Sequence, residues 1–336
     1  MRRIPIALAL ATLFAAGTYA QQKTQYTPPK TAWGDPDLSG IWPSTDMVGV
    51  PFERPANFGE RNEVTQEEYD SRLKQQSTRE EADAETTVST APRQGDGTGP
   101  PSHWLEWGKA SKQASLLVEP RDGRLPPTTP EAQRRAGSLR NTYVIVDGFA
   151  EAGELGPYDR CISRGPLGSI FPVIYNNGNQ IFQFPGYVVI RYEMIHEVRV
   201  VPLDGRGHVS PKIRTYMGDA RGHWDGNTLV VETTNLNGRT GAQANGNLMM
   251  LSDEAKIIEK FTRTAPDSLQ YEVTVSDPRT WTKPWTAAFP LRRDMSYGMF
   301  EYACHEGNHA MSNILSAARS ADKTDRGAAS STGGVQ

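Results

Sequence analysis

The sequence predicts a mainly β protein, an antiparallel meander that forms a barrel or a strongly bent sheet, with a few short helices and long loops. Three hairpin patterns are the main observation, at 180–201, 223–234 and 257–276. In each, runs rich in Val, Ile, Thr and aromatic residues flank turn-forming residues. The helical crossovers that parallel strands require do not separate these runs, so neighbouring strands are expected to pair antiparallel.

Each predicted hairpin contains a turn signal between two strand-like runs. The turns are Pro185-Gly186 between 180–183 and 187–201, Asp225-Gly226 before the run 229–234, and Pro266-Asp267-Ser268 between 257–264 and 269–276. Gly and Asp-Gly favour tight turns because glycine adopts positive φ without steric cost.

Three short helices are predicted outside the strands, over 65–84, 130–136 and 308–321. Thr65 and Glu68 have the spacing of a capping box, which marks the start of the first helix. Pro130 stands at the start of the second, and Met311, Ile314 and Leu315 share one face of the third.

The chain therefore divides into four predicted segments. They are a signal peptide at 1–20, an N-terminal extended or loop region with one helix at 21–114, a β-barrel-like domain with a C-terminal helix at 115–321, and a disordered tail at 322–336. The tail is expected to be disordered because it lacks apolar residues that could pack against the domain.

The composition excludes several classes of protein. The 336 residues carry a formal net charge of −3, with 22% charged and 37% hydrophobic residues. A nucleic-acid-binding protein usually carries an excess of basic residues, and a protein with several membrane spans needs repeated long apolar runs. We therefore expect a small-molecule partner, without nucleic acid or integral membrane contact; the oligomeric state stays open.

The first twenty residues have the pattern of a secretory signal. Arg2 and Arg3 are followed by an apolar run at 4–16 and by Thr18-Tyr19-Ala20, a plausible cleavage site. This predicts a mature chain in the periplasm or outside the cell; the alternative is an uncleaved anchor. In an oxidising compartment, the two cysteines, Cys161 and Cys304, predict a disulfide. The alternative is a catalytic thiol at Cys304, beside His305.

Two resemblances add to this interpretation. The segment Asp37–Trp42, with Gly40-x-Trp42, resembles the first strand of lipocalin-type barrels, which implies a tryptophan at the barrel floor. Seven further segments resemble a large group of secreted bacterial proteins of unassigned activity. They are Trp33–Leu38, Arg160-Cys161, Tyr192–His196, Met217–Asp219, Trp224–Gly226, Thr282–Trp285 and Glu301–Asn308. This second resemblance implies no reaction and no residue roles.

One candidate catalytic cluster lies in the predicted strand 187–201. On a single strand, Tyr192, Met194, His196 and Val198 share one face, which is mostly apolar and carries one Tyr and one His. Such a face suits a ligand cavity in which an imidazole moves a proton. The alternative is a hydrogen-bonded core histidine.

A second cluster precedes the last predicted helix. His305 and Glu306 could act as base and acid, while Asn308 could cap the helix. A bridge from Cys304 to Cys161 is expected to bring Arg160 and Arg164 near His305, where they could bind an anionic substrate. The alternative is a structural group of salt bridges around a disulfide.

Substrate-binding residues are predicted among the aromatic, amide and basic side chains. The candidates are Tyr175, Asn177, Arg164, Trp224, Trp285 and Tyr302. Tyr and Trp combine apolar area with a polar group, which suits partly apolar or sugar-like ligands. Each is alternatively a core or turn residue.

A metal site receives little support from the sequence. His196, His208, His223 and His305 could form a zinc site, but no pair has the close spacing seen in many metal motifs. His223 stands beside a predicted turn, where exposure is expected. We therefore expect no metal and no other cofactor.

These observations favour a secreted enzyme that uses acid–base chemistry, of the lyase, isomerase or hydratase type, on a small molecule in a barrel cavity. His196 is the predicted base, Tyr192 or Glu306 the acid, and Arg160 the electrostatic clamp, with His305 facing the same cavity. The alternatives are a non-catalytic lipocalin-like binding protein and a metal-dependent hydrolase.

Overall fold

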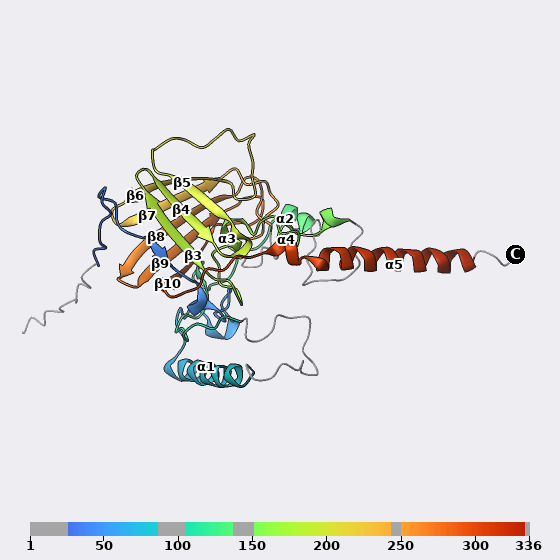
Figure 1. Ribbon diagram of the computed structural model, residues 1–336, viewed down its shortest axis with the longest axis horizontal. Helices are drawn as coiled ribbons and strands as arrows, with labels where there is room; N and C mark the ends of the chain where they lie inside the picture. The colour runs from blue at the N-terminus through green and yellow to red at the C-terminus, as the bar shows by residue number, and fades with distance from the viewer. Residues whose placement is uncertain (1–25, 87–104, 137–150, 243–249, 333–336) are drawn as a thin grey trace, which may run out of the picture.

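The computed structural model describes residues 26–86, 105–136, 151–242 and 250–332. The predicted signal peptide at 1–20 and the last residues of the predicted tail, 333–336, lie outside these ranges. Within them, no helix is both long and apolar enough to cross a membrane. The fold is mainly β, with two antiparallel sheets and a few helices (Figure 1).

The strands form one four-stranded and one six-stranded sheet. The first has the order β1 (Gly40–Ile41), β3 (Asn179–Phe184), β4 (Tyr187–Tyr192) and β5 (Val198–Pro202). The second has the order β2 (Leu117–Glu119), β10 (Trp285–Arg292), β9 (Ser268–Ser276), β8 (Lys256–Ala265), β7 (Thr228–Thr234) and β6 (Asp219–Asp225). From β6 to β10 each strand pairs with the next in sequence, which confirms the predicted meander.

The turn residues of the three hairpins have the predicted role. Gly186 joins β3 to β4 with φ of 80°, and Gly226 joins β6 to β7 with φ of 58°. Both values lie in the left-handed region that glycine tolerates best. Pro266-Asp267 connects β8 to β9, where the register shifts between Arg263 and Ala265.

The helices that correspond to the predicted ones are α1 (Gln66–Thr86), α2 (Pro130–Arg135) and α5 (His309–Thr332), and the helical turn α4 (Cys304–Gly307) precedes α5. Short turns add η1 (Thr45–Met47), η2 (Ala56–Phe58), η4 (Ala152–Glu154), α3 (Gly165–Gly168) and η5 (Met194–His196). The capping box is confirmed, because Thr65 N–H donates to Glu68 Oε2 (2.6 Å) and Glu68 N–H donates to Thr65 Oγ1 (3.2 Å). Helix α5 points away from the sheets (Figure 1) and continues to Thr332, past the predicted end at 321.

The two sheets enclose the core without forming one closed ladder among the described residues. At one seam, β5 lies beside β6, where a Cβ on Gly222 would come within 2.7 Å of Val201 and Leu203. At the other seam, a backbone hydrogen bond joins Asp294 N–H to the Ile41 carbonyl (3.0 Å). The predicted mainly β class is therefore confirmed, whereas a closed barrel is not.

The core includes residues from the region 21–114 that was predicted to be extended or loop. Trp42 follows β1 and is fully buried, and its Nε1–H donates to the Leu38 carbonyl (2.8 Å). The guanidinium groups of Arg263 and Arg293 lie 5.7 and 5.9 Å from the centre of a Trp42 ring. The N-terminal region and the β region thus share one core.

The single predicted strand 187–201 is wrong, because the chain turns in its middle. Ile195 and His196 have φ of 57° and 46°, and the turn η5 separates β4 from β5. A left-handed residue cannot continue a pleated strand, so the two-residue alternation does not run through this segment. Tyr192 and Met194 are consequently buried, whereas His196 and Val198 are exposed.

A buried ion pair joins the two sheets at the centre of the core. Arg199 on β5 makes two hydrogen bonds to Glu259 on β8, Nη1 to Oε2 (2.7 Å) and Nη2 to Oε1 (3.0 Å). The side chains are 3% and 0% exposed. Tyr271 donates its hydroxyl proton to Glu259 Oε1 (3.0 Å), and Arg199 lies 5.9 Å from the centre of the Tyr192 ring.

We predict that Glu259→Gln lowers the free energy of unfolding by about 3–5 kcal/mol, because it leaves the Arg199 charge buried without its counter-ion. Urea denaturation at pH 7 measures this loss. The control is Glu272→Gln, which breaks the exposed pair with Lys260 and should cost at most about 1 kcal/mol. Equal losses in the two variants would contradict the role given to the buried pair.

Candidate functional site

A cavity lies outside the sheets, between the C-terminal segment and three loops. Its volume is about 910 Å³, within the range of small-molecule sites. The lining residues are Glu106, Tyr158, Asp159, Cys161, Tyr175, Asn176, Phe300, Glu301, Tyr302, Ala303, Cys304, Gly307, Asn308, Ala310, Met311 and Ile314. The cavity therefore combines aromatic, acidic and aliphatic side chains from segments far apart in the sequence.

Three tyrosines, Tyr158, Tyr175 and Tyr302, form the polar and aromatic part of the wall. The hydroxyl oxygens of Tyr158 and Tyr302 are 3.5 Å apart. Burial raises the pKa of Tyr158 and of Tyr302 above the usual phenol value, and Tyr175 adds to the rise in both. Both phenols therefore remain protonated at neutral pH, where they can donate hydrogen bonds.

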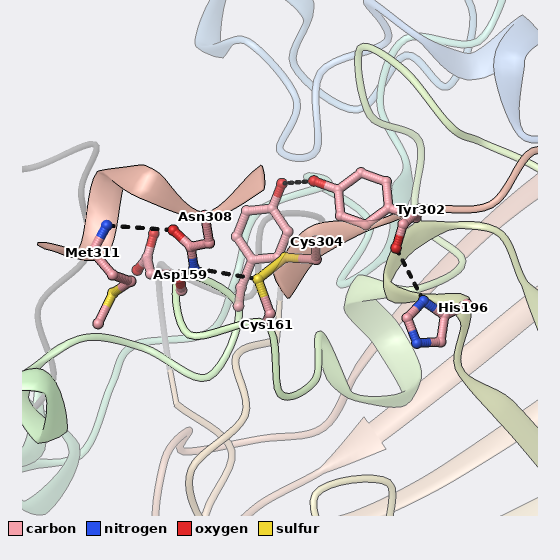
Figure 2. The surroundings of a disulfide bond; sticks show 8 residues. Asp159, Cys161, His196, Tyr302, Cys304, Asn308 and Met311 are labelled. Carbon is pink, nitrogen blue, oxygen red and sulfur yellow. Dashed lines mark hydrogen bonds between the residues drawn. A yellow bond between two sulfur atoms is a disulfide. The ribbon is translucent and has the colours of Figure 1, made fainter. Parts of the chain in front are cut away.

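The predicted disulfide is present and ties two walls of the cavity together. Cys161 and Cys304 are bridged over a sequence separation of 143 residues (Figure 2). Asn308 adds to this connection, since its Nδ2 donates to the Asp159 carbonyl (2.9 Å) and to Cys161 Sγ (3.3 Å). Asn308 Oδ1 also accepts from Met311 N–H (3.4 Å), as expected of a residue that caps α5.

Two carboxylates hold the loops that form the opposite wall. Glu193 is 1% exposed and accepts from the backbone N–H of Phe300 (3.0 Å) and from Asn176 Nδ2 (3.0 Å). Glu106 accepts from Asn176 N–H (2.6 Å). The Tyr297 hydroxyl lies 2.8 Å from Glu106 and 2.7 Å from Glu193. Glu193 thus positions Asn176 and Phe300 without lining the cavity itself.

The predicted pair of His196 and Tyr192 does not come together at the cavity. Tyr192 is fully buried in the core, where burial raises its pKa, and its hydroxyl has no hydrogen-bond partner among the described residues. His196 is exposed, and its Nδ1 lies 3.0 Å from the Tyr302 carbonyl oxygen (Figure 2). A carbonyl only accepts, so Nδ1 must carry the proton. His196 therefore contacts the backbone of a lining residue rather than the cavity.

The second predicted cluster is also arranged differently. His305 and Glu306 are exposed in the helical turn α4, not on a strand, and neither lines the cavity. Neither His196 nor His305, which were expected to face one cavity, is among the lining residues of this cavity. Arg164 is buried, with its guanidinium 5.1 Å from the centre of the Tyr158 ring. Arg160 is half-buried and stands between two lining residues without lining the cavity.

Of the predicted binding residues, the structure brings Tyr175 and Tyr302 to the cavity. Asn177 lies just behind it, buried, and donates to Glu106 Oε2 (2.9 Å). Trp285 is 1% exposed in the core, where its ring packs edge-on against Trp281. Trp224 is half-buried on β6 and packs against the same core. The two tryptophans are therefore structural.

The two other candidate histidines, His208 and His223, are not among the described lining residues of the cavity. His223 is exposed beside its turn, as predicted. His208 lies between two carboxylates, with Nδ1 2.7 Å from Asp219 Oδ2 and Nε2 3.2 Å from Glu232 Oε1. In the described ranges, no group of three or more His, Cys, Asp and Glu side chains is arranged to hold a metal ion.

Sequence reasoning missed Glu106, Tyr158, Asp159 and Phe300. Tyr158 and Asp159 could have been found through their closeness to Cys161, since a disulfide joins its flanking residues to those of the partner cysteine. Asn176 is an amide in the turn-forming segment Asn176-Asn177-Gly178, and its φ is 56°. Glu106 and Phe300 carry no local signal, because distant segments bring them to the site.

We predict that the double variant Cys161→Ser/Cys304→Ser lowers the free energy of unfolding by about 5 kcal/mol. The bridge closes a loop over a sequence separation of 143 residues and so reduces the entropy of the unfolded chain, and the variant loses this effect. Urea denaturation with and without reductant measures it, and reductant should destabilise the wild type but leave the variant unchanged. A thiol reagent should label no cysteine in denatured, non-reduced wild type. Two labelled cysteines per chain would rule out the bridge.

Comparison with known protein families, characterised proteins and solved structures gives no match to this chain. The function therefore has to be argued from the cavity. Its relevant features are the three tyrosines, the disulfide and the carboxylates that hold the loops.

Proposed function

We propose that this protein binds a small, partly apolar organic molecule in the cavity between Tyr158, Tyr175 and Tyr302. The observation that supports it most is the cavity of about 910 Å³ with aromatic walls and an aliphatic side formed by Met311 and Ile314. Most ligand sites combine such apolar walls with a few polar groups that orient the ligand. Here the phenol hydroxyls and the Asn176 amide are the orienting groups.

The stiffness of the walls supports a preformed site. The Cys161–Cys304 bridge joins one wall covalently, and Glu193 accepts hydrogen bonds from Asn176 Nδ2, Gly178 N–H and Phe300 N–H on the other side. Cys161 and Asn176 both have positive φ and both line the cavity. Unfavourable backbone angles that the surrounding contacts maintain are frequent at binding sites.

The rim of the cavity exposes an aromatic side chain. Phe300 is 70% exposed, although its backbone N–H is held by Glu193 at 3.0 Å. An exposed apolar ring at the mouth of a concave site would lose its contact with water when a ligand enters. Phe300 is therefore well placed to cover a bound molecule.

The compartment belongs to the same proposal. Export rests on the signal-like pattern at 1–20, which precedes the described residues, and the disulfide is compatible with an oxidising location. The ligand would then be a molecule met in the periplasm or outside the cell.

We predict that a library of small aromatic and aliphatic molecules contains ligands that raise the melting temperature of the wild type. A ligand at 100 times its Kd adds about 2.7 kcal/mol of stability. Tyr302→Ala should weaken binding at least tenfold because it removes a wall of the cavity. Tyr187→Ala, which removes an exposed tyrosine on β4, is the control and should leave binding unchanged. Binding that is equal in both variants would contradict the site.

A second candidate function is acid–base catalysis on the bound molecule, of the lyase, isomerase or hydratase type. The observation that favours it is the Tyr158–Tyr302 hydroxyl pair in a cavity that Asp159 also lines. Protonated phenols can act as general acids, and a carboxylate can accept a proton. In this version the cavity residues replace His196 and His305 as the reacting groups, and His196 positions Tyr302 through its carbonyl.

For this second function we expect Tyr302→Phe to lower turnover of a bound substrate by about 10²–10⁴-fold, since the general acid is lost. The ring remains, so affinity should change by less than about fivefold. Product formation followed by NMR, together with a binding titration of the same variant, separates the two effects. Ligands that bind without turnover in the wild type would leave binding as the function.

A further inference from the structure

We infer that the ligand of this cavity is an organic cation with an apolar body, such as a quaternary or protonated amine attached to an aromatic or aliphatic group. This inference rests on the proposed function, because it names the chemical class that the same cavity would take. Three features of the walls support it: their charge, their aromatic rings and their aliphatic side.

The charged residues in the described part of the cavity lining are all acidic. They are Glu106, Asp159 and Glu301, and no Lys, Arg or His is among the described lining residues. A concave site with charges of one sign concentrates ligands of the opposite sign. A bound anion would face these acidic residues without a basic partner in the described part of the lining.

The carboxyl groups differ in their availability to a ligand. Glu106 already accepts hydrogen bonds from Thr45, Asn176 and Asn177, and it shares the single Tyr297 hydroxyl proton with Glu193, so it contributes mainly through its charge. Glu301 is exposed at the rim, where its carboxylate can turn toward an incoming ammonium group. Asp159 stands deeper, beside the disulfide.

Four aromatic rings surround the same space, those of Tyr158, Tyr175, Phe300 and Tyr302. The face of an aromatic ring carries partial negative charge and attracts cations, and several such rings together recognise quaternary ammonium groups. Tyr158 already has a cation near its ring, because the buried Arg164 guanidinium lies 5.1 Å from the ring centre. Tyr175, Phe300 and Tyr302 are the rings that we assign to the ligand.

The aliphatic side of the cavity accounts for the apolar body. Met311 and Ile314 on α5 and the Cys161–Cys304 bridge line it and offer no charged group. A small inorganic cation would leave this surface in contact with water, and it would lack a cluster of carboxylates at ligand distance, since none is arranged for a metal in the described residues. A cation with an apolar group makes use of both parts of the wall.

The test uses three probes of similar size that differ in charge: benzyltrimethylammonium, benzyl alcohol and phenylacetate. Isothermal titration calorimetry with the full mature chain gives their affinities at low and high salt. We expect the cation to bind at least tenfold more tightly than the alcohol, and the anion to bind least. We also expect added salt to weaken cation binding, because the attraction is partly electrostatic.

Variants of exposed residues test the charge without endangering the fold. Glu301→Gln should weaken binding of the cation about 3- to 10-fold and leave that of benzyl alcohol unchanged. Glu151→Gln is the matched control, since it removes the same charge from an exposed residue that does not line the cavity. Phe300→Leu should weaken cation binding about fivefold while keeping an apolar side chain at the rim.

The outcomes separate this inference from the proposed function. Tighter binding of the cation that falls in Glu301→Gln but not in Glu151→Gln supports the inference. If the alcohol or the anion binds as tightly as the cation or more tightly, and this binding is lost in Tyr302→Ala, the inference of a cationic ligand is overturned. The proposed binding function then stays in place. If none of the three probes binds at millimolar concentration, the inference is overturned as well, and the broader library then decides the binding function alone.

Discussion

The buried ion pair of Arg199 and Glu259 determines how the space between the two sheets is packed. Two charges at the centre of a core are tolerated only when each satisfies the other and further donors complete their hydrogen bonds. The bidentate contact and the Tyr271 hydroxyl meet this requirement. Among the described residues, an ion pair and aromatic rings therefore occupy the space between the sheets, and the cavity described above lies outside it.

Because the interior is filled, the candidate site lies at the outside of the sheets. Its walls come from four separate parts of the chain: Glu106, 158–161, 175–176 and 300–314. The disulfide at Cys161 and Cys304 holds two of these parts together, and Asn308 adds hydrogen bonds across the same junction. A site built in this way can be rigid although most of it is loop.

Carboxylates perform different tasks in the two regions. In the core, Glu259 neutralises a buried cation, whereas Glu193 and Glu106 accept backbone N–H groups and the Tyr297 hydroxyl around the cavity. Loops need such acceptors because their N–H groups have no partner in a strand or helix. Glu106 and Glu193 also make the neighbourhood of the cavity acidic, so the requirement for ordered loops and the proposed preference for a cationic ligand have a common origin.

The sequence by itself determined the mainly β class, the meander, its turns, the helix starts and the disulfide pairing, because each depends on local periodicity, on turn chemistry or on a cysteine count of two. It did not determine the break at Ile195 and His196, since nothing in their residue types indicates left-handed backbone angles. That break moved His196 away from Tyr192.

Tyr175 and Tyr302 were found as aromatic candidates, but Glu106, Asp159 and Phe300 were not. Only the tertiary structure decided which segments surround the cavity, because contacts such as that of Tyr297 with Glu106, 191 positions apart, depend on sheet pairing and on the bridge, not on local pattern.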